Sequence, residues 1–280
     1  MEPILLCPNC KNSLTQKDNV YQCIENHSFD ISKEGYLNLL LVNQKSTNFP
    51  GDDLTMVTAR RKFLDQGFYQ CLVEQINLIT KNNLKNKSEG DQIILDCGCG
   101  EGYYTNKLFQ YLKELNKPST VFGLDLSKDA IRIAAKKYRD ITFIISNLNY
   151  ELPFKDSSVD LIINIFAPKN PNEFSRILVK GGIVIVAFPN NVHLKSLKEK
   201  LGSLTQYGDK PQEVIGNFSK DFKLIDTKQV ETNINLSPEN AEELVKMTPI
   251  YWQIDHKKLT TLKQMTTEIG FNIYIFKKVR

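Results

Sequence analysis

The sequence predicts an α/β fold in which helices cover both faces of a parallel sheet, with a small metal-binding module in front of it. From residue 91 onward, short apolar runs alternate with amphipathic stretches, and a glycine-rich turn follows the first apolar run. Continuous apolar strands that alternate with helices are typical of parallel sheets buried on both faces. Three cysteines and a histidine near the start of the chain predict the metal-binding module.

Composition limits the class of protein. Of the 280 residues, 41% are hydrophobic and 24% are charged, which excludes global disorder and a fibrous repeat. The formal net charge of +4 permits an anionic partner without requiring one. The longest apolar runs are about half a membrane span, and the first residues lack the basic start of a signal peptide. We therefore expect a cytoplasmic protein with no membrane partner, whose six cysteines are thiols or metal ligands rather than disulfides.

Three zones follow one another along the chain. Residues 1–45 are rich in turns and show no apolar periodicity that builds a core, so we expect a metal to staple this zone. Residues 46–90 form a helical linker, with a hinge over 46–51, helical spacing over 52–85 and a polar loop over 82–90. Residues 91–280 form the sheet domain.

The predicted elements of the sheet domain alternate. Each strand is a short apolar run, and each helix shows inward-facing residues; Ser127 and Asp129 suit a helix cap and first turn. The expected order is strand 93–95, helix 103–115, strand 120–124, helix 127–138, strand 142–145, strand 161–166, helix 172–178 and strand 183–188. Residues 214–230 and 271–277 are expected to add further strands.

The metal-binding module contains the pattern Cys-x2-Cys-x12-Cys-x3-His, formed by Cys7, Cys10, Cys23 and His27. Zinc takes four sulfur or nitrogen ligands at tetrahedral corners, and a Cys-x2-Cys turn places two thiolates on one ion. A closed set of four protein ligands predicts a structural zinc site rather than a catalytic one. The alternative is a coincidental pairing of cysteines in a loop, and the pattern alone does not indicate nucleic-acid binding.

The glycine-rich turn contains Gly98, Gly100 and Gly102 directly after the first strand of the sheet domain. The spacing is Gly-x-Gly-x-Gly, which differs from the dinucleotide motif Gly-x-Gly-x-x-Gly. Asp96, just before the turn, would repel a pyrophosphate and suits an amine-bearing ligand. Asp125, at the end of the second strand, stands where a carboxylate accepts both hydroxyls of a ribose. These features together predict S-adenosylmethionine as the cofactor, the alternative being a purely structural turn.

Two residues after later strands complete the predicted cleft. Asn147 follows the third strand, near the expected edge of an adenine. Phe166 ends the fourth strand, at the carboxyl edge of the sheet, where such folds bind the methyl acceptor. Phe166 is therefore a candidate for stacking on a planar substrate, although a core aromatic at a strand end is equally consistent with the pattern.

The order of these segments resembles class I S-adenosylmethionine-dependent methyltransferases from about residue 91 onward. Two blocks are more specific, because general methyltransferases lack them: Lys33-Glu34-Gly35-Tyr36 and Ala59-Arg60-Arg61. With the cysteine cluster they resemble the bacterial 23S rRNA (guanine-N1)-methyltransferase family, RlmA, over nearly the whole chain. Further matching blocks are 29–30, 37–40, 50–52, 62–69, 96–105, 122–128, 167–168, 193–194, 197–198 and 247–249.

The resemblance implies a Rossmann-like, mostly parallel seven-stranded sheet and a zinc module that helps to recognise an rRNA hairpin. It also implies 23S rRNA as the partner, a possible homodimer, and zinc on the four residues named above. It places the cofactor against Tyr69, Gly100, Glu101 and His193. From the residues alone, core packing in an amphipathic helix is the simpler interpretation of Tyr69. His193 is equally a surface loop histidine, and Glu101 is otherwise a first-turn residue favoured by the helix dipole.

The implied reaction transfers the methyl group of S-adenosylmethionine to guanine N1, and the enzyme mainly supplies proximity and alignment. A group must accept the N1 proton; His193, Asp65 and the backbone carbonyls at the end of the fourth strand are candidates, and Phe166 and His193 are the catalytic candidates overall. Basic residues at 60–62, at 195, 198 and 200, and at 277–280 form a phosphate-binding rim if the fold gathers them. The alternatives are a small-molecule methyltransferase and a non-catalytic zinc-ribbon RNA-binding protein.

Overall fold

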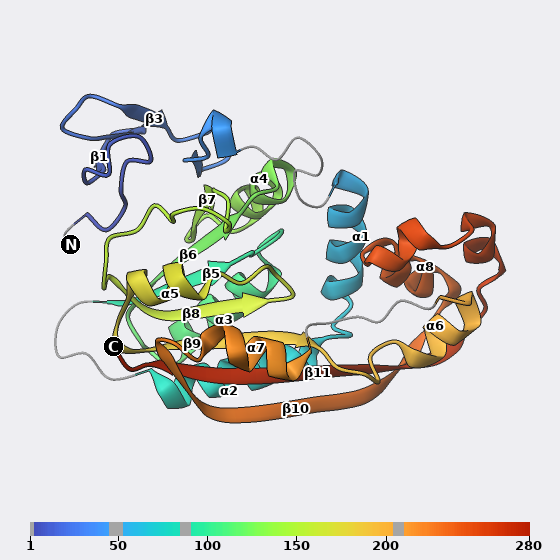
Figure 1. Cartoon of the computed structure of the whole chain (residues 1–280). Coiled ribbons are helices and arrows are strands. Elements are labelled where there is room, and N and C mark those ends of the chain that lie inside the picture. Colours follow the sequence, from blue (N-terminus) through green and yellow to red (C-terminus); the bar gives the residue numbers. More distant parts are fainter. Residues whose placement is uncertain (1–2, 45–52, 85–90, 204–209) are drawn as a thin grey trace.

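The computed structural model describes residues 3–44, 53–84, 91–203 and 210–280. Eight strands form one twisted sheet, and three short strands near the amino terminus form a second one (Figure 1). The order in the large sheet is β10-β11-β9-β8-β5-β6-β7-β4. The five central strands and β4 run parallel, whereas β11 is antiparallel to both β9 and β10. The predicted parallel α/β sheet is therefore confirmed.

The strands of the large sheet are β4 (Tyr36–Asn38), β5 (Gln92–Cys97), β6 (Ser119–Asp125), β7 (Thr142–Ile145), β8 (Val159–Ile165), β9 (Leu178–Pro189), β10 (Phe222–Leu236) and β11 (Met265–Lys278). Seven of them form the sheet that the resemblance implied. The eighth, β4, comes from the zone that was predicted to be separate, and it extends the sheet by pairing in parallel with β7. The expectation of seven strands was too low, because a three-residue strand next to a cysteine cluster carries no distinctive periodicity.

The helices are α1 (Leu54–Asp65), α2 (Gln70–Asn83), α3 (Tyr103–Glu114), α4 (Lys128–Lys137), α5 (Pro171–Ile177), α6 (Lys195–Leu201), α7 (Pro211–Phe218) and α8 (Pro238–Lys246). The predicted linker helix is two helices, which residues 66–69 separate. Residues 214–230 are not one strand as predicted, because α7 precedes β10. The apolar residues of α7 follow helical spacing, and the strand pattern begins only at Phe222.

Side chains alternate between two hydrophobic clusters on the two faces of the sheet. In β5, Ile94 faces one cluster, whereas Ile93 and Leu95 face the other. The first cluster receives α2, α3, α4 and α8, and the second receives α5 and α7. Both faces are thus buried, which explains the continuous apolar runs of the central strands.

The N-terminal module (residues 3–44) packs on the second face. Its short sheet consists of β1 (Thr15–Lys17), β2 (Val20–Gln22) and β3 (Ser28–Asp30), and the 3-10 helix η1 (Val42–Gln44) ends its described part. Leu5 and Leu14 are buried in the same cluster as the α5 residue Phe174. The Leu6 backbone N–H donates to Pro153 O at 3.0 Å, and Lys155 N–H donates to Ile4 O at 2.9 Å. The module has no core of its own and shares the core of the large sheet.

A segment that the sequence did not single out lies between β10 and β11. This insertion (residues 237–263) contains α8 and the 3-10 helices η2 (Pro249–Gln253) and η3 (His256–Thr261). It packs against α1, beyond the end of the sheet (Figure 1). Its buried side chains are Ala241, Leu244, Val245, Met247, Thr248, Ile250, Leu259 and Leu262.

Several predicted features fall on undescribed residues. The hinge over 46–51, most of the loop over 82–90 and the block 50–52 lie outside the described part of the chain. The zone boundaries after residues 45 and 90 therefore stay predictions. Among the described residues, no helix is both long enough and apolar enough to cross a membrane.

Candidate functional site

A cavity of about 930 Å³ lies at the carboxyl ends of the parallel strands. The turns after β5, β6, β7 and β8 line it, together with residues from α1, the loop after β9 and the insertion. Parallel α/β sheets bind ligands at this edge, because the chain leaves the sheet toward opposite faces there. Seven of the nine predicted cofactor residues line the cavity: Tyr69, Gly98, Gly100, Glu101, Asp125, Asn147 and His193.

The glycine-rich turn is held by the neighbouring strand. The backbone N–H groups of Gly98 and Cys99 both donate to Leu124 O, at 2.7 and 3.0 Å. Gly98 has φ +84°, and a Cβ atom on it would lie 2.2 Å from the Cβ atom of Ala167. Only glycine combines this left-handed backbone with such a close approach to the loop after β8. The close approach joins the turn after β5 to the turn after β8.

Asp125 ends β6 and lies beside this turn. Its Oδ2 accepts a hydrogen bond from Gly100 N–H at 2.9 Å, and its Oδ1 accepts one from Ser127 N–H at 2.8 Å. Each oxygen of a carboxylate can accept more than one hydrogen bond. A carboxylate fixed in this way is suited to accept two adjacent hydroxyl groups.

Glu101 is a buried carboxylate in the cavity wall, only 4% exposed. Its Oε2 accepts a hydrogen bond from Tyr103 N–H at 3.1 Å, whereas its Oε1 has no hydrogen-bond partner among the described residues. Burial raises the pKa of Glu101 to about 7, although the positive charge of Arg60 opposes the rise. A bound cation would stabilise the ionised form, so Glu101 marks a position for a positively charged group.

Two predicted cofactor residues do not line the cavity. Asp96 is buried behind the turn, where its Oδ2 accepts a hydrogen bond from Thr105 Oγ1 at 2.6 Å, and burial raises its pKa to about 7. A Cβ atom on Gly102 would lie 2.9 Å from Phe143 Cζ, so this glycine permits packing of the turn against β7. The carboxylate predicted to meet an amine is therefore better assigned to Glu101 than to Asp96, because Glu101 lies in the cavity wall.

Asn147 lines the cavity, but its side chain forms hydrogen bonds to backbone groups of the protein. The Nδ2 group donates to Gln44 O at 2.9 Å, and Oδ1 accepts from Asn149 N–H at 3.0 Å. Gln44 is the last described residue of the N-terminal module before a gap. Asn147 thus connects that module to the cavity wall.

Aromatic side chains also line the cavity. Phe166 is 41% exposed and adopts φ +54°, an unfavourable conformation for a bulky residue. Its ring lies 6.4 Å from that of Tyr69, 6.3 Å from that of Tyr104 and 5.5 Å from that of Phe271. Asn164 supports the turn, because its Nδ2 donates to Cys97 O at 2.9 Å and to Pro168 O at 3.0 Å. Strain at an exposed ring favours the stacking role of Phe166 over the core role.

His193 and Tyr69 form a buried pair in the same wall. Gly270 N–H donates to His193 Nδ1 at 3.2 Å, so this nitrogen is the acceptor of a neutral ring and Nε2 carries the hydrogen. His193 Nε2 lies 3.3 Å from Tyr69 Oη and donates to it. Burial lowers the pKa of His193 to about 3, with a further lowering by Lys198. A neutral histidine with both nitrogens engaged positions Tyr69 and is unsuited to accept a substrate proton.

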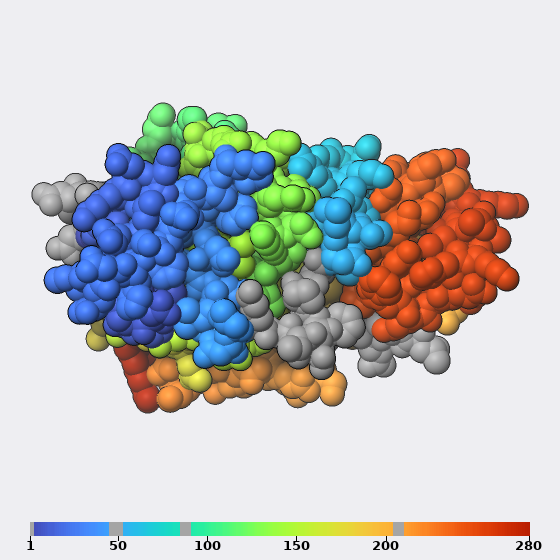
Figure 2. Space-filling model, turned by 90° about the horizontal axis from the view of Figure 1, so that it is seen from above, coloured from blue at the N-terminus to red at the C-terminus, as the bar shows by residue number. Residues whose placement is uncertain are grey.

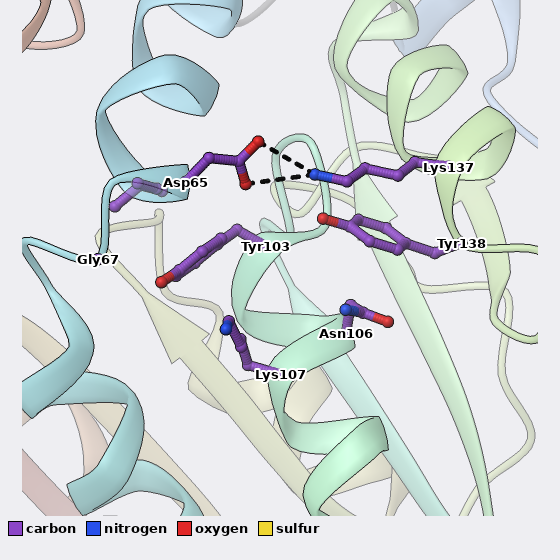
Figure 3. A pocket seen from close by; sticks show the side chains of 8 residues that line it. Asp65, Gly67, Tyr103, Asn106, Lys107, Lys137 and Tyr138 are labelled. Carbon is purple, nitrogen blue, oxygen red and sulfur yellow. Dashed lines mark hydrogen bonds and ion pairs between the residues drawn. The ribbon is translucent and has the colours of Figure 1, made fainter.

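Asp65 lies outside the cavity, contrary to its proposed role as a base. It lines a separate pocket of about 190 Å³ between α1, α3 and α4 (Figure 3). There its Oδ1 and Oδ2 accept hydrogen bonds from Lys137 Nζ at 3.2 and 3.1 Å. The preceding residue, Leu64, lines both this pocket and the cavity, whereas Asp65 lines the pocket alone.

The predicted metal ligands come together in the N-terminal module. One ligand atom each of Cys7, Cys10, Cys23 and His27 lies within 4.8 Å of the others. Cys10 Sγ is 3.6 Å from Cys23 Sγ, which is 3.4 Å from His27 Nδ1. A tetrahedral zinc site with bonds of about 2.0–2.3 Å requires ligand separations of about 3.5–3.8 Å. The Asn12 backbone N–H, as the largest cause, lowers the pKa of Cys10 to about 6, which favours the thiolate.

Comparisons with known proteins agree with both parts of this geometry. Residues 5–48 match the family described as RlmA, N-terminal, a zinc ribbon, and residues 88–261 match a methyltransferase domain. A 23S rRNA (guanine(748)-N(1))-methyltransferase of Streptomyces fradiae is 30% identical over 91% of this chain and 88% of its own length. The chain belongs to the 23S rRNA (guanine-N1)-methyltransferase family. A putative member from Bacillus subtilis is 29% identical over 92% of this chain and 90% of its own length.

Solved structures support the fold of this family member. A Bacillus subtilis protein, YcgJ, matches 74% of this chain and 99% of its own chain, with 15% identity and a TM-score of 0.51. A structure of a Haloferax volcanii methyltransferase activator with a putative methyltransferase matches 82% of this chain and 99% of that chain, with 18% identity and a TM-score of 0.50. At these identities the likeness concerns the fold alone.

The cofactor of this methyltransferase is S-adenosylmethionine, and its metal is zinc. The cavity fits the cofactor, because the Glu101 carboxylate suits its ammonium group and the Asp125 carboxylate suits its ribose hydroxyls. The Cys3His cluster fits zinc in ligand type and spacing.

The structure separates the basic groups that were expected to form one rim. Arg60 lines the cavity and donates from Nη2 to Met247 O at 3.4 Å, whereas Arg61 and Lys62 form ion pairs with Asp65 and Glu243. Lys277 and Lys278 are the last residues of β11, and residues 279–280 follow them, at the end of the sheet away from the cavity (Figure 1). Lys277 pairs there with Ile183 of β9. The tail therefore does not belong to the cavity rim.

Sequence reasoning missed three contributions to the cavity. Met56, Arg60 and Leu64 of α1 line it, and their spacing of four residues would have placed them on one helix face. Tyr104 lines it with a buried hydroxyl that has no hydrogen-bond partner among the described residues. Met247, Thr248 and Pro249 of the insertion also line it, and no local pattern indicates this position.

Proposed function

We propose that the protein transfers a methyl group from S-adenosylmethionine to N1 of a guanine in a hairpin of 23S rRNA. The observation that carries this proposal is one cavity whose lining holds two unlike groups, the glycine-rich turn with Asp125 and the strained, exposed Phe166. The relatives from Streptomyces fradiae and Bacillus subtilis support the choice of substrate. Because this family modifies rRNA, we also propose a cytoplasmic location.

The cofactor, when bound, supplies the methyl group of its sulfonium. In this proposal Asp125 accepts hydrogen bonds from the ribose hydroxyls, and Glu101 pairs with the ammonium group. Phe166 stacks on the guanine ring and aligns N1 with the methyl group, which is the main requirement for displacement at an activated carbon. The guanine must leave its stack to reach Phe166, as in other enzymes that act on a base.

The guanine loses its N1 proton when the new C–N bond forms. Asp65 lies in another pocket, and His193 already holds Tyr69 through Nε2–H. Of the three predicted acceptors there remain the carbonyls at the end of β8, where Ile165 and Phe166 line the cavity. We assign them the role of orienting N1–H, with the proton passing to water as the bond forms. Tyr69, which accepts from His193, directs its own hydroxyl hydrogen toward another acceptor.

Primer extension across 23S rRNA tests the proposed reaction. N1-methylation blocks base pairing, so reverse transcriptase should stop at one guanine in rRNA from cells that contain the protein. The stop should disappear when the gene is deleted and return when the wild-type protein is supplied. Identical stops in both strains would overturn the proposal. Calorimetry with S-adenosylmethionine serves as an independent check, and absence of binding would exclude the enzyme.

We further propose that the N-terminal module helps to recognise the hairpin, with zone boundaries after residues 45 and 90 and a homodimer as the assembly. Exchange of a ligand, Cys7→Ser, should release zinc and reduce rRNA methylation by about 100-fold or more, since structural zinc contributes on the order of 10 kcal/mol to small modules. Cys71→Ser is the matched control, because Cys71 is a half-buried thiol of α2 outside the cluster.

Cofactor affinity in Cys7→Ser should stay within about tenfold of wild type. Metal content by atomic absorption, cofactor affinity by calorimetry and methylation of 23S rRNA are measured on both variants. Full methylation by a zinc-free Cys7→Ser protein would rule out a role of the module in recognition.

A further inference from the structure

The insertion continues the cavity wall outward. Met247, Thr248 and Pro249 line the cavity, and η2 begins at Pro249. Two contacts attach this region to α1: Arg60 Nη2 donates to Met247 O at 3.4 Å, and Lys62 Nζ lies 3.0 Å from Glu243 Oε1. The buried side chains of Ile250 and Leu259 anchor the two 3-10 helices to the core. The residue three positions after Pro249, one turn of a 3-10 helix, follows directly on this cavity-lining segment.

That position belongs to Trp252, the single tryptophan of the chain. Trp252 is 60% exposed, and it is the one large hydrophobic side chain in the insertion that is exposed. An exposed indole is unusual, because tryptophan is among the most buried side chains on average. Its ring is not loose: it lies edge-on to Tyr251 at 5.0 Å, and Tyr251 stacks on His256 at 4.3 Å with an interplanar angle of 14°. His256 Nε2 also lies 2.9 Å from Tyr251 O, which closes the small aromatic group.

The charges around Trp252 favour a nucleic acid over an apolar protein surface. Of the three carboxylates of α8, Glu242 pairs with Lys246 at 2.7 Å and Glu243 with Lys62 at 3.0 Å, whereas the exposed Glu239 lies in the first turn of the helix. Asp255 accepts the Lys257 backbone N–H at 3.0 Å as the cap of η3. The Lys257 side chain is exposed, as are Gln253 and His256. One aromatic face beside cationic and polar groups is the arrangement by which proteins bind single-stranded nucleotides.

The opposite side of the cavity carries the other module. There Asn147 holds Gln44 of the N-terminal module at 2.9 Å. Figure 2 shows the N-terminal module in blue at one end of the molecule, the insertion in orange and red at the other, and α1 in cyan beside the insertion. The cavity thus lies between the N-terminal module and the insertion, and a bound substrate can contact both.

We propose that Trp252 stacks on an unpaired nucleotide next to the target guanine, and that Lys257 binds the adjoining phosphate. This inference rests on the proposed function and adds a second RNA contact surface to it, on the side opposite the zinc module. Stacking on an exposed ring requires an unstacked base, so the surface selects loop nucleotides over a continuous duplex.

The single tryptophan makes the proposal directly measurable. Intrinsic fluorescence of the zinc-loaded wild-type protein, saturated with S-adenosylhomocysteine, is titrated with a synthetic RNA hairpin of the 23S rRNA target loop. Stacking should quench and shift the emission of Trp252, whereas a continuous RNA duplex of equal length should leave it nearly unchanged. Emission that stays constant while binding is detected by filter retention would overturn the proposal. A change that follows protein concentration without RNA would also overturn it, because it would assign the surface to a second copy of the chain.

Variants give an independent measure. Trp252→Ala should weaken hairpin binding and lower kcat/KM for the RNA by about 5- to 150-fold, whereas Trp252→Phe should retain most of the affinity. Lys257→Ala should weaken binding several-fold and make it less sensitive to salt. Lys223→Ala, an exposed lysine of β10 that pairs with Lys277 at the far edge of the sheet, is the control and should bind as wild type.

Two failures are distinguishable. If the wild-type protein methylates no rRNA, the proposed function fails, whatever Trp252 does. If it methylates rRNA and Trp252→Ala matches wild type in RNA binding and kcat/KM, only the Trp252 surface fails. Trp252→Ala and the wild-type protein should bind the cofactor with the same affinity. A lower cofactor affinity in Trp252→Ala would show that this variant is misfolded. In that case, RNA binding by Trp252→Phe and the fluorescence quenching of the wild-type protein test the proposal.

Discussion

The two sides of the cavity are built from the chain in different ways. The glycine side (Gly98, Gly100, Glu101 and Asp125) comes from two adjacent strands and the turns that follow them. The aromatic side (Tyr69, Tyr104, Phe166 and His193) combines residues from a helix cap, a helix, a strand end and a loop. A cofactor of constant structure needs fixed backbone donors and carboxylates, which a short motif provides. A base that leaves its stack in RNA needs an exposed ring, which Phe166 provides, while the buried Tyr69 and His193 hold the wall around it.

The comparison predicts the largest effect for a backbone change on the glycine side. Gly98→Ala forces a side chain into φ +84° and toward the Cβ atom of Ala167, so the turn must move away from the loop after β8. The left-handed backbone alone costs about 1–2 kcal/mol, and the overlap adds to it. We expect cofactor binding to fall below detection in calorimetry.

Gly216→Ala is the matched control, because nothing lies within 4 Å of a Cβ atom at this position of α7. It should bind the cofactor normally and unfold at an equal or slightly higher denaturant concentration. If the cofactor affinity of Gly98→Ala is within about tenfold of the wild-type affinity, the glycine-rich turn can move without loss of cofactor binding, which would contradict the prediction.

A change of charge on the glycine side should have the next largest effect. In Asp125→Asn, the amide nitrogen cannot accept, so Gly100 N–H or Ser127 N–H loses its acceptor, and both ribose contacts lose their charge. Charge-assisted hydrogen bonds contribute about 1.5–3 kcal/mol each, so cofactor affinity should fall by about 100-fold or more.

The control for this change is Asp129→Asn in the first turn of α4, where Asp129 lies 3.5 Å from Arg132 on the surface. It should leave cofactor affinity unchanged in the same titration. Equal affinities of Asp125→Asn and Asp129→Asn would remove Asp125 from the cofactor site.

On the aromatic side, Phe166→Ala should impair the acceptor and spare the cofactor. Loss of one stacked ring costs about 1–3 kcal/mol, which predicts a 5- to 150-fold decrease of kcat/KM for rRNA. Ile225→Ala on β10 is the control, because Ile225 is likewise 41% exposed. Cofactor affinity and single-turnover methylation are measured for both. If Phe166→Ala binds the cofactor more weakly than the wild-type protein does, Phe166 contributes to cofactor binding and not to acceptor binding alone.

His193 gives the smallest expected effect, on stability. Its native pKa of about 3 lies below the ordinary value of 6.5, so between these values the unfolded chain binds the additional proton. The stability that neutral His193 contributes is therefore present above pH 6.5 and is lost as the pH falls toward 3. In His193→Gln this dependence is absent.

The wild-type free energy of unfolding, minus that of His193→Gln, should therefore rise by at most about 1.4 kcal/mol per pH unit between about pH 4 and pH 6. Urea unfolding followed by circular dichroism at several pH values measures the difference. Asp96 and Glu101 have raised pKa values, so the native state binds more protons at these groups in this range and their contribution to stability changes in the opposite direction. Subtracting the free energy of His193→Gln from that of the wild-type protein removes this contribution. A difference that is independent of pH would show that His193 is solvated in the native state.

The glycine side could be predicted from the sequence because its geometry is local. Gly98, Gly100 and Asp125 directly follow two strands whose apolar runs are unambiguous, and parallel strands end at a common edge. The metal ligands were predictable for the same reason, since spacing along a short chain restricts which four atoms can meet. Asp96 was assigned wrongly in position, because alternation along β5 turns its side chain behind the turn.

The aromatic side was only partly predictable. Phe166 was identified from its place after a strand, but Tyr69 and His193 came from family resemblance and Asp65 was misplaced. The wall of the insertion was not anticipated, because Met247 caps the end of α8 and Trp252 lies in a short 3-10 helix, and neither position carries a regular period. Arg60 was predicted to belong to a basic group on the surface. In the structure it lies on the face of α1 that lines the cavity, where its charge acts on Glu101.

The sequence by itself determined the parallel sheet, the cofactor turn and the four metal ligands. Each of these depends on residues a few positions apart, whose relative geometry the backbone restricts to few possibilities. The tertiary structure decided that β4 joins the large sheet, that His193 is neutral and holds Tyr69, and that the insertion extends the cavity wall. These depend on contacts between residues 77 to 187 positions apart, and only packing of the whole core selects such contacts.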